Sequence, residues 1–395
     1  MTRTIHALCC LTTITLAPAC LDPTAGQPDP DLGSEPDDPG DGRDDGFFAG
    51  KADGACVEED TPAGDGVLAL VNDPSVSFEF LDAPLAQGGV GLDRRAAQGI
   101  VEGRPFADLQ QLDAVPYVGI HACSALAHHA CNVEQRCVAP LPLLSWNTEH
   151  FPLTPAAPGG VIDIVDELRP ALVGLQEVEH SGAFGDVLDG LDGYSGILGE
   201  PGPFTRVGLL IDDHALEVLA VEHLFVDDGW AFPRPVLGVR VRPRRAATPM
   251  EITVLVLHLK ALPDATSRSR RALAIEDLRQ LVDERRAQGN GEIVILGDWN
   301  DELLDAPAVN VFTPLLDDTA FAKFLTFDAA ESGEATLIPF NALLDHVMVT
   351  QEVLAVAPHL STEILHLDMT WSPDYEQTVS DHRPVLSVFG LPQPW

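Results

Sequence analysis

The chain has 395 residues, 45% of them hydrophobic, which is enough to bury a full core and to form one large domain plus a smaller one. Its formal net charge is −38, from 61 Asp and Glu against 23 Lys and Arg. This balance excludes a general nucleic-acid coat protein, because phosphate binding depends on Lys and Arg.

Residues 1–19 have the pattern of an export signal. Arg3 supplies a positive charge, residues 7–17 are mostly apolar, and Ala17-Pro18-Ala19 precedes Cys20. The apolar stretch is too short to span a bilayer. Because Leu16 to Cys20 resembles a bacterial lipoprotein box, we expect a lipid on Cys20 and an extracytoplasmic, membrane-anchored protein. Ordinary cleavage after Ala19, giving a secreted protein, is the alternative.

The cysteine count favours lipidation. Cys9 and Cys10 leave with the signal, and a lipid on Cys20 leaves four others: Cys56, Cys123, Cys131 and Cys137. An even number suits two disulfides in an exported protein. Four cysteines allow three connectivities, and the sequence does not choose among them.

Residues 20–65 and 66–138 differ sharply in composition. The first segment is acidic and rich in Pro and Gly, with few large apolar residues, so it is expected to be a disordered tether. The second has helical apolar spacing and two Gly-containing turns, Gly89-Val90-Gly91 and Val118-Gly119-Ile120. It resembles the helix-hairpin-helix modules of DNA-uptake and repair proteins, in which hairpin amides approach a DNA phosphate. A disulfide-stapled helical spacer that does not bind nucleic acid is the alternative.

Residues 139–395 alternate strand-like with helix-like segments. Helices are expected at 161–168 and 268–286, where apolar residues recur at helical period. Strands are expected at 141–145, 172–176, 207–211, 252–259, 293–296, 344–349 and 385–389. This alternation predicts a layered α/β domain.

Polar residues stand at the ends of several of these strands. In chain order they are Trp146-Asn147, Gln176-Glu177-Val178, His258-Leu259-Lys260, Gly297-Asp298-Trp299-Asn300-Asp301, Asp345-His346 and Ser380-Asp381-His382-Arg383. Carboxylates, amides and imidazoles on one rim suit metal-assisted cleavage of a phosphate ester. The series resembles the endonuclease/exonuclease/phosphatase superfamily, which implies a four-layer α/β sandwich of two mixed β-sheets flanked by helices.

The resemblance also implies a role for each polar residue. Glu177 is the main metal-binding carboxylate, with Asn147 and Asp381 beside it. Mg²⁺ suits such oxygen ligands, with Mn²⁺ or Ca²⁺ as alternatives. Asp298 and Asn300 position the attacking water and a phosphate oxygen. The catalytic histidine is His382, oriented by Asp345, and His258 faces the phosphate.

A locally basic segment indicates the substrate. Residues 234–271 contain nine Lys and Arg but only Glu251 and Asp264 as acids. We therefore expect a monomeric nuclease acting on DNA, with RNA as a further substrate, and no protein partner is indicated. The expected substrate contacts are Arg206, Arg234, Lys260, Arg268 and Arg271. A sphingomyelinase-type phospholipid phosphodiesterase and a catalytically silent surface module are the alternatives, and the basic residues could instead pair with carboxylates.

Overall fold

The computed structural model describes residues 56–202, 205–246 and 249–393. Among them the chain forms two compact units, a helical unit ending at Val138 and an α/β unit spanning Ala139–Leu391. Cys20, the signal and most of the expected tether lie outside the described residues. No helix within the described part is long and apolar enough to cross a bilayer.

The helical unit confirms the helical spacing in the sequence. Its helices are α1 (Pro62–Asn72), α2 (Phe78–Asp82), η1 (Leu85–Gln87), α3 (Arg94–Gly103), α4 (Leu109–Asp113), α5 (Ile120–His128) and the π-helical turn η2 (His129–Val133). Their apolar faces share one core that includes Leu70, Ile100 and Leu126. The unit therefore has its own hydrophobic centre.

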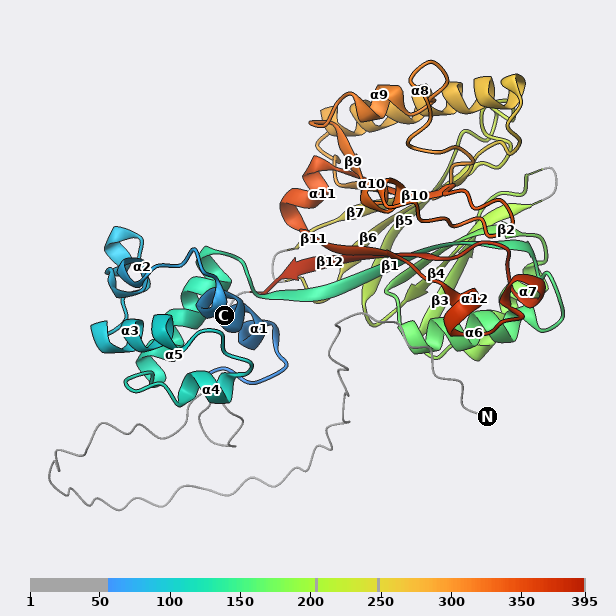
Figure 1. Ribbon diagram of the computed structural model, residues 1–395. Helices are drawn as coiled ribbons and strands as arrows, with labels where there is room; N and C mark the ends of the chain where they lie inside the picture. Colours follow the sequence, from blue (N-terminus) through green and yellow to red (C-terminus); the bar gives the residue numbers. More distant parts are fainter. Residues whose placement is uncertain (1–55, 203–204, 247–248, 394–395) are drawn as a thin grey trace, which may run out of the picture. The chain divides into compact units, whose positions relative to one another are not determined.

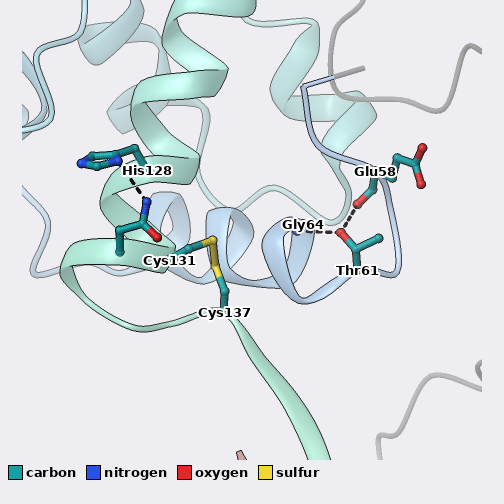
Figure 2. Close-up of a disulfide and its surroundings, with 7 residues drawn as sticks. Glu58, Thr61, Gly64, His128, Cys131 and Cys137 are labelled. Atoms are coloured by element: carbon teal, nitrogen blue, oxygen red, sulfur yellow. Dashed lines mark hydrogen bonds between the residues drawn. A yellow bond between two sulfur atoms is a disulfide. The ribbon is translucent and has the colours of Figure 1, made fainter. Parts of the chain in front are cut away.

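Capping residues begin these helices where the sequence changes from turn to helical period. Asp93 caps α3 by accepting a hydrogen bond from the Arg95 amide, directly after the first Gly-containing turn. Gly91 in that turn has φ +80°, a conformation that an L side chain rarely adopts. At α1, Thr61 Oγ1 accepts from the Gly64 amide at 3.1 Å and donates to the Glu58 carbonyl at 2.7 Å (Figure 2).

Two disulfides staple the helical unit. Cys56 pairs with Cys123, and Cys131 pairs with Cys137 at the start of the first long strand, as Figure 2 shows for the second pair. This is one of the three connectivities that four cysteines allow. The expected pair of disulfides is confirmed.

The α/β unit contains two mixed six-stranded sheets. The first has the order β11 (His359–Ile364), β12 (Val385–Pro392), β1 (Val138–Phe151), β2 (Leu172–Val178), β4 (Arg206–Asp212) and β3 (Tyr194–Leu198). The second has the order β5 (Leu216–Leu224), β6 (Val236–Pro243), β7 (Ile252–His258), β8 (Ile293–Asp298), β10 (Asp345–Thr350) and β9 (Ala322–Phe324). Each contains one parallel pair, β1 with β2 and β7 with β8, beside antiparallel neighbours.

The two sheets pack face to face with helices outside them (Figure 1). Residues such as Leu172 and Val256 fill the layer between the sheets. On the outer face of the first sheet lie α6 (Ala157–Leu168) and α7 (Ser181–Gly190), and α8 (Ala265–Ala287) covers the second sheet. Short helices complete the unit: α9 (Thr313–Leu316), α10 (Phe327–Glu331), α11 (Gln351–Val356), α12 (Leu367–Thr370) and α13 (Tyr375–Thr378). The expected four-layer α/β sandwich is confirmed.

Candidate active site

Strand pairing brings the polar strand ends together. In the second sheet Asp298, the last residue of β8, is paired with His258 on the parallel β7 and with Asp345 on the antiparallel β10. In the first sheet Asn147 on β1 is paired with Gln176 on β2, next to Glu177. The Asn147 amide then bridges the two sheets, because its Nδ2 donates to Asp298 Oδ2 at 2.9 Å.

Close packing and hydrogen bonds hold the turn at Gly297–Asn300 in place. Gly297 has φ +145°, and a Cβ on it would lie 2.0 Å from the Leu257 carbonyl oxygen, so only glycine lets β8 approach β7 this closely. Trp299 is fully buried and donates through Nε1 to the His346 carbonyl at 3.0 Å. Asp298 Oδ1 accepts from the Asn300 amide at 2.9 Å. The turn therefore holds the Asp298 carboxylate in one orientation.

A buried aspartate and histidine form a close pair in the site. His382 Nδ1 lies 2.7 Å from Asp345 Oδ2, and the two residues are 6% and 0% exposed. Burial alone would lower the pKa of His382, but the Asp345 charge and hydrogen bond, helped by Asp298 and Asp381, raise it to about 10. With Nδ1 bound to Asp345, the ring presents Nε2, which is 3.8 Å from Asp381 Oδ1.

Asp298 and His258 form a second buried pair. His258 Nε2 lies 3.5 Å from Asp298 Oδ2 and 3.8 Å from Glu177 Oε1. Burial, followed by the charge of Asp345, raises the pKa of Asp298 to about 7 despite opposing effects of His382 and Asn147. Burial and then the positive charge of Arg234 lower the pKa of His258 well below its usual value. At neutral pH His258 is therefore a neutral ring beside a carboxyl group that can exchange a proton.

An oxygen-rich cluster lies beside these pairs. Glu177 has φ +63°, and its Oε2 accepts from the His150 amide at 3.0 Å while Oε1 receives Asn147 Nδ2 at 3.4 Å. Glu149 Oε2 accepts from the Asp381 amide at 2.9 Å. Burial and the neighbouring carboxylates Asp381 and Glu177 raise the pKa of Glu149, and burial likewise raises that of Asp381.

This cluster fits a hard divalent cation. Burial is the main cause of the raised pKa values of Glu149 and Asp381, and repulsion from neighbouring carboxylates adds to it; a bound cation would relieve that repulsion. Atoms of Asp298, Asp345 and His382 also lie within 4.8 Å of one another and could hold a metal. In that trio, however, His382 and Asp345 already bind each other, whereas the carboxylates around Glu177 offer only oxygen ligands.

The sequence matches the model of the Endonuclease/Exonuclease/phosphatase family over residues 144–382, which is more than half of the chain. The chain belongs to this family. The matched stretch begins just before Asn147 and ends at His382, so it contains every polar residue of the site described above.

The chain is also similar to solved structures at low sequence identity. The chain is similar to humanized D. rerio TDP2 with 12% identity, a TM-score of 0.48 and coverage of 63% of this chain and 98% of that one. The human Nocturnin catalytic domain with bound sulfate is 16% identical, with a TM-score of 0.49 and coverage of 63% of this chain and 93% of that one. An endonuclease/exonuclease/phosphatase from Bacteroides vulgatus is 19% identical, with a TM-score of 0.47 and coverage of 64% of this chain and 99% of that one. A comparison with curated proteins gives no match.

Sequence reasoning missed several residues of this family site. Glu149 follows Asn147 by two positions, but no periodic signal distinguishes it from an ordinary surface acid. Ser380 Oγ donates to the Asn147 carbonyl at 2.6 Å and accepts from the His382 amide at 2.9 Å. The buried Tyr375 donates to the His382 carbonyl at 2.6 Å and accepts from Trp146 Nε1 at 2.9 Å. These two hydroxyl groups hold the loop that carries His382.

His346 lies outside the candidate site, although it belongs to one of the polar strand ends. Its ring is fully buried between Thr326 Oγ1, 2.9 Å from Nδ1, and the Asp301 carbonyl, 3.0 Å from Nε2. The carbonyl can only accept, so Nε2 carries the hydrogen and Nδ1 accepts from Thr326. Burial lowers the pKa of His346 to about 4.

The expected substrate cations have different surroundings. Arg234 donates to Thr205 Oγ1 at 3.1 Å and to the Leu259 carbonyl at 3.4 Å, close enough to Glu177 and Asp298 for their charges to affect its pKa. Lys260 Nζ donates to the Ala261 carbonyl.

Two of the other expected contacts have internal partners. Arg271 is 1% exposed and bonds to Asp301 at 2.9 Å and to the carbonyls of Lys260 and Leu262. Arg268 reaches the Pro263 carbonyl at 3.4 Å, and Arg206 begins β4 opposite Val178. Of the five expected contacts, Arg234 and Lys260 are the two whose positive charges, after burial, lower the pKa of His258.

The basic segment is partly neutralised within the fold. On β6, Arg242 contacts Glu217 and Glu251 at 3.1 and 2.7 Å, and Arg240 contacts Glu251 at 3.4 Å. These arginines pair with carboxylates, as the alternative interpretation of the sequence stated. The charge excess counted along the chain is therefore larger than the excess available to a substrate.

Proposed function

We propose that the protein is a divalent-metal-dependent phosphodiesterase that hydrolyses nucleic acid, DNA foremost, by in-line attack of water. The observation that carries this proposal is the buried Asp345–His382 pair at 2.7 Å beside Asp298. A phosphodiester has little intrinsic reactivity, so a catalyst must neutralise charge, orient water and transfer protons. The described residues supply each of these functions.

Two buried acids divide the proton transfers. Asp298, with its pKa near 7, can accept a proton from water at neutral pH, and the Asn300 amide keeps its carboxylate in place. His382, with its pKa near 10, holds a proton and can donate it from Nε2 to the departing oxygen. Asp345 keeps that ring oriented and stabilises its charged form. The neutral His258 and Arg234 can contact the phosphate oxygens.

The metal site in this proposal consists of Glu177 and Asp381, with Glu149 beside them and Asn147 contributing its amide oxygen. Mg²⁺ prefers a few such hard oxygen ligands and retains several waters. When bound, it would neutralise charge on the phosphate. The repulsion among these carboxylates supports this assignment.

Nucleic acid is the favoured substrate because two cations without a carboxylate partner in the residues that the structure describes lie near the site. Arg234 and Lys260 both act electrostatically on His258, and neither has a carboxylate within 4.0 Å among the described residues. The test is incubation of the purified protein with plasmid DNA and Mg²⁺. Cleavage that EDTA abolishes is expected. Release of phosphocholine from sphingomyelin with the plasmid left intact would contradict the nuclease assignment.

We further propose that the protein is exported and anchored by a lipid on Cys20. The two disulfides support export, because disulfides persist in oxidising compartments, and they leave Cys20 without a partner among the mature cysteines. Cys20→Ser should move the protein from the membrane fraction to the soluble fraction. Unchanged fractionation would contradict the anchor.

A further inference from the structure

An exposed tryptophan lies against an arginine in the α/β unit. Trp230, in the loop between β5 and β6, is 54% exposed. The Arg270 guanidinium carbon lies 4.8 Å from the centre of its ring, and Arg270 also bonds to the carbonyls of Trp230 and Gly229, the latter at 3.1 Å. The helix α8 thereby fixes the loop and the ring, so this aromatic surface is held in place.

The cations at this position lack carboxylate partners. Further along α8, Arg271, Arg279, Arg285 and Arg286 each contact an Asp or Glu within 3.0 Å. By contrast, neither Arg270 nor Lys260 has a carboxylate within 4.0 Å in the described part of the chain. Burial, followed by the nearby charges of Arg270 and Arg234, lowers the pKa of Lys260. Acids do lie in the neighbourhood, since Asp228 Oδ1 accepts from the Trp230 amide at 3.1 Å and Asp264 acts on Lys260, but neither forms an ion pair with Arg270 or Lys260.

These cations adjoin the active site. Lys260 follows His258 by two residues, and the intervening Leu259 carbonyl accepts from Arg234 and, at 3.4 Å, from Asn300 Nδ2. The Lys260 carbonyl accepts from Arg271, the neighbour of Arg270 on α8. The chain thus links the end of β7, the start of α8 and the Trp230 loop through direct contacts.

We propose that Trp230, Arg270 and Lys260 form a second subsite that binds a nucleotide flanking the scissile phosphodiester. Lys260 and Arg270 would bind a neighbouring phosphate, and the Trp230 ring would stack on a base. This inference rests on the proposed nuclease function. A single strand presents phosphates and aromatic faces together, which matches this surface.

A phospholipid headgroup matches it less well. Phosphocholine carries a quaternary ammonium group, and the positive charge of Arg270 beside the Trp230 ring, with Lys260 close enough to Arg270 for their charges to interact, would repel that group. Recognition of such a group normally uses aromatic faces without cations beside them. The charge pattern therefore favours nucleic acid.

The test compares two substrates of the full-length protein. Bis(4-nitrophenyl) phosphate is a diester without bases, and a single-stranded oligonucleotide has both bases and flanking phosphates. Trp230→Ala should lower kcat/KM for the oligonucleotide by at least about tenfold more than for the small diester, chiefly through KM. Trp230→Phe should restore most of the loss because its ring can still stack. Leu360→Ala, at an exposed apolar residue of the edge strand β11, is the matched control.

The contribution of Lys260 to the subsite is measured separately, through the salt dependence of the rate. Lys260→Gln should reduce the slope of log kcat/KM against log salt for the oligonucleotide by about 1, whereas Lys323→Gln, at an exposed lysine on β9, should leave that slope unchanged. Thermal unfolding of each variant identifies any loss of fold. Trp230→Phe provides a second measurement if Trp230→Ala does not fold.

The outcomes separate this inference from the proposed function. If the unmodified protein cleaves neither substrate with Mg²⁺, the proposed function fails. If it cleaves both, and Trp230→Ala lowers the two rates by the same factor, the subsite is wrong. The subsite is also wrong if Trp230→Ala weakens binding to phosphatidylcholine and phosphatidylglycerol vesicles while oligonucleotide cleavage stays normal.

Discussion

His382 Nδ1 and Asp345 Oδ2 are 2.7 Å apart, although 37 residues separate them in the chain. Asp345 begins β10 in the second sheet, and His382 lies just before β12 of the first sheet. Their contact therefore depends on the packing of one sheet against the other. Because both are buried, the charge of Asp345 acts on the imidazole with little screening by water.

Asp345→Asn should therefore lower kcat by roughly 10² to 10⁴, because an amide no longer favours the charged, correctly oriented ring. The change is nearly isosteric, so the fold should persist. NMR titration should show the pKa of His382 falling from about 10 towards its usual range. A variant that retains both the rate and the raised pKa would refute the role assigned to Asp345.

Glu177→Gln should weaken the apparent affinity for Mg²⁺ by at least about tenfold, because an amide oxygen carries no charge to attract the cation. The measurement is the Mg²⁺ dependence of the initial rate, supported by Mn²⁺ binding followed by electron paramagnetic resonance. Glu179→Gln is the matched control, since that carboxylate contacts His150 at 2.6 Å. Equal effects of the two substitutions on Mg²⁺ affinity would contradict the assignment of Glu177 to the metal site.

The rate should have a bell-shaped pH dependence. Asp298 accepts a proton only when ionised, so activity should rise as pH increases through about 7. His382 donates a proton only when charged, so activity should fall as pH approaches about 10. Asp345→Asn should move the alkaline limb to lower pH. An alkaline limb that does not move would mean that it reports another group.

Acid should destabilise the fold through His346. Its pKa is lowered from 6.5 to about 4 by burial, so the folded state resists protonation while the unfolded state accepts a proton. The contribution is complete above pH 6.5 and is lost as pH falls towards 4. The loss is about 3 kcal/mol in the free energy of unfolding. Urea titrations at several pH values measure it, and His346→Gln should flatten the dependence. An unchanged dependence in that variant would contradict this explanation.

Much of the α/β unit could be predicted from sequence because its pattern is local. The segment at 293–296 is continuously apolar and ends at Gly297-Asp298, and the observed strand β8 covers Ile293–Asp298. The helix expected at 268–286 is α8, which begins three residues earlier because Asp264 caps it. By contrast, β5 was missed. Strand β5 has only one buried residue, Leu216, and exposes apolar residues such as Val218 and Val221, so its pattern is weak.

The site could be predicted only where a motif marked it. Asn147, Glu177, Asp298, Asp345 and His382 carry the family resemblance, and the structure brings all five together. Glu149 and Tyr375 act through contacts made by the tertiary fold, which no local pattern shows. The positive charge available from the basic segment, residues 234–271, was overestimated for the same reason. Partners such as Glu217 for Arg242 are visible only once β5 pairs with β6.

The most direct test of the central claim is the rate of plasmid cleavage with saturating Mg²⁺ by the unmodified protein and by His382→Ala. We predict a fall of roughly 10² to 10⁴ with an unchanged circular dichroism spectrum, because the variant loses the group that transfers the proton. An equal rate in the two proteins would contradict the assignment of the Asp345–His382 pair as the catalytic centre.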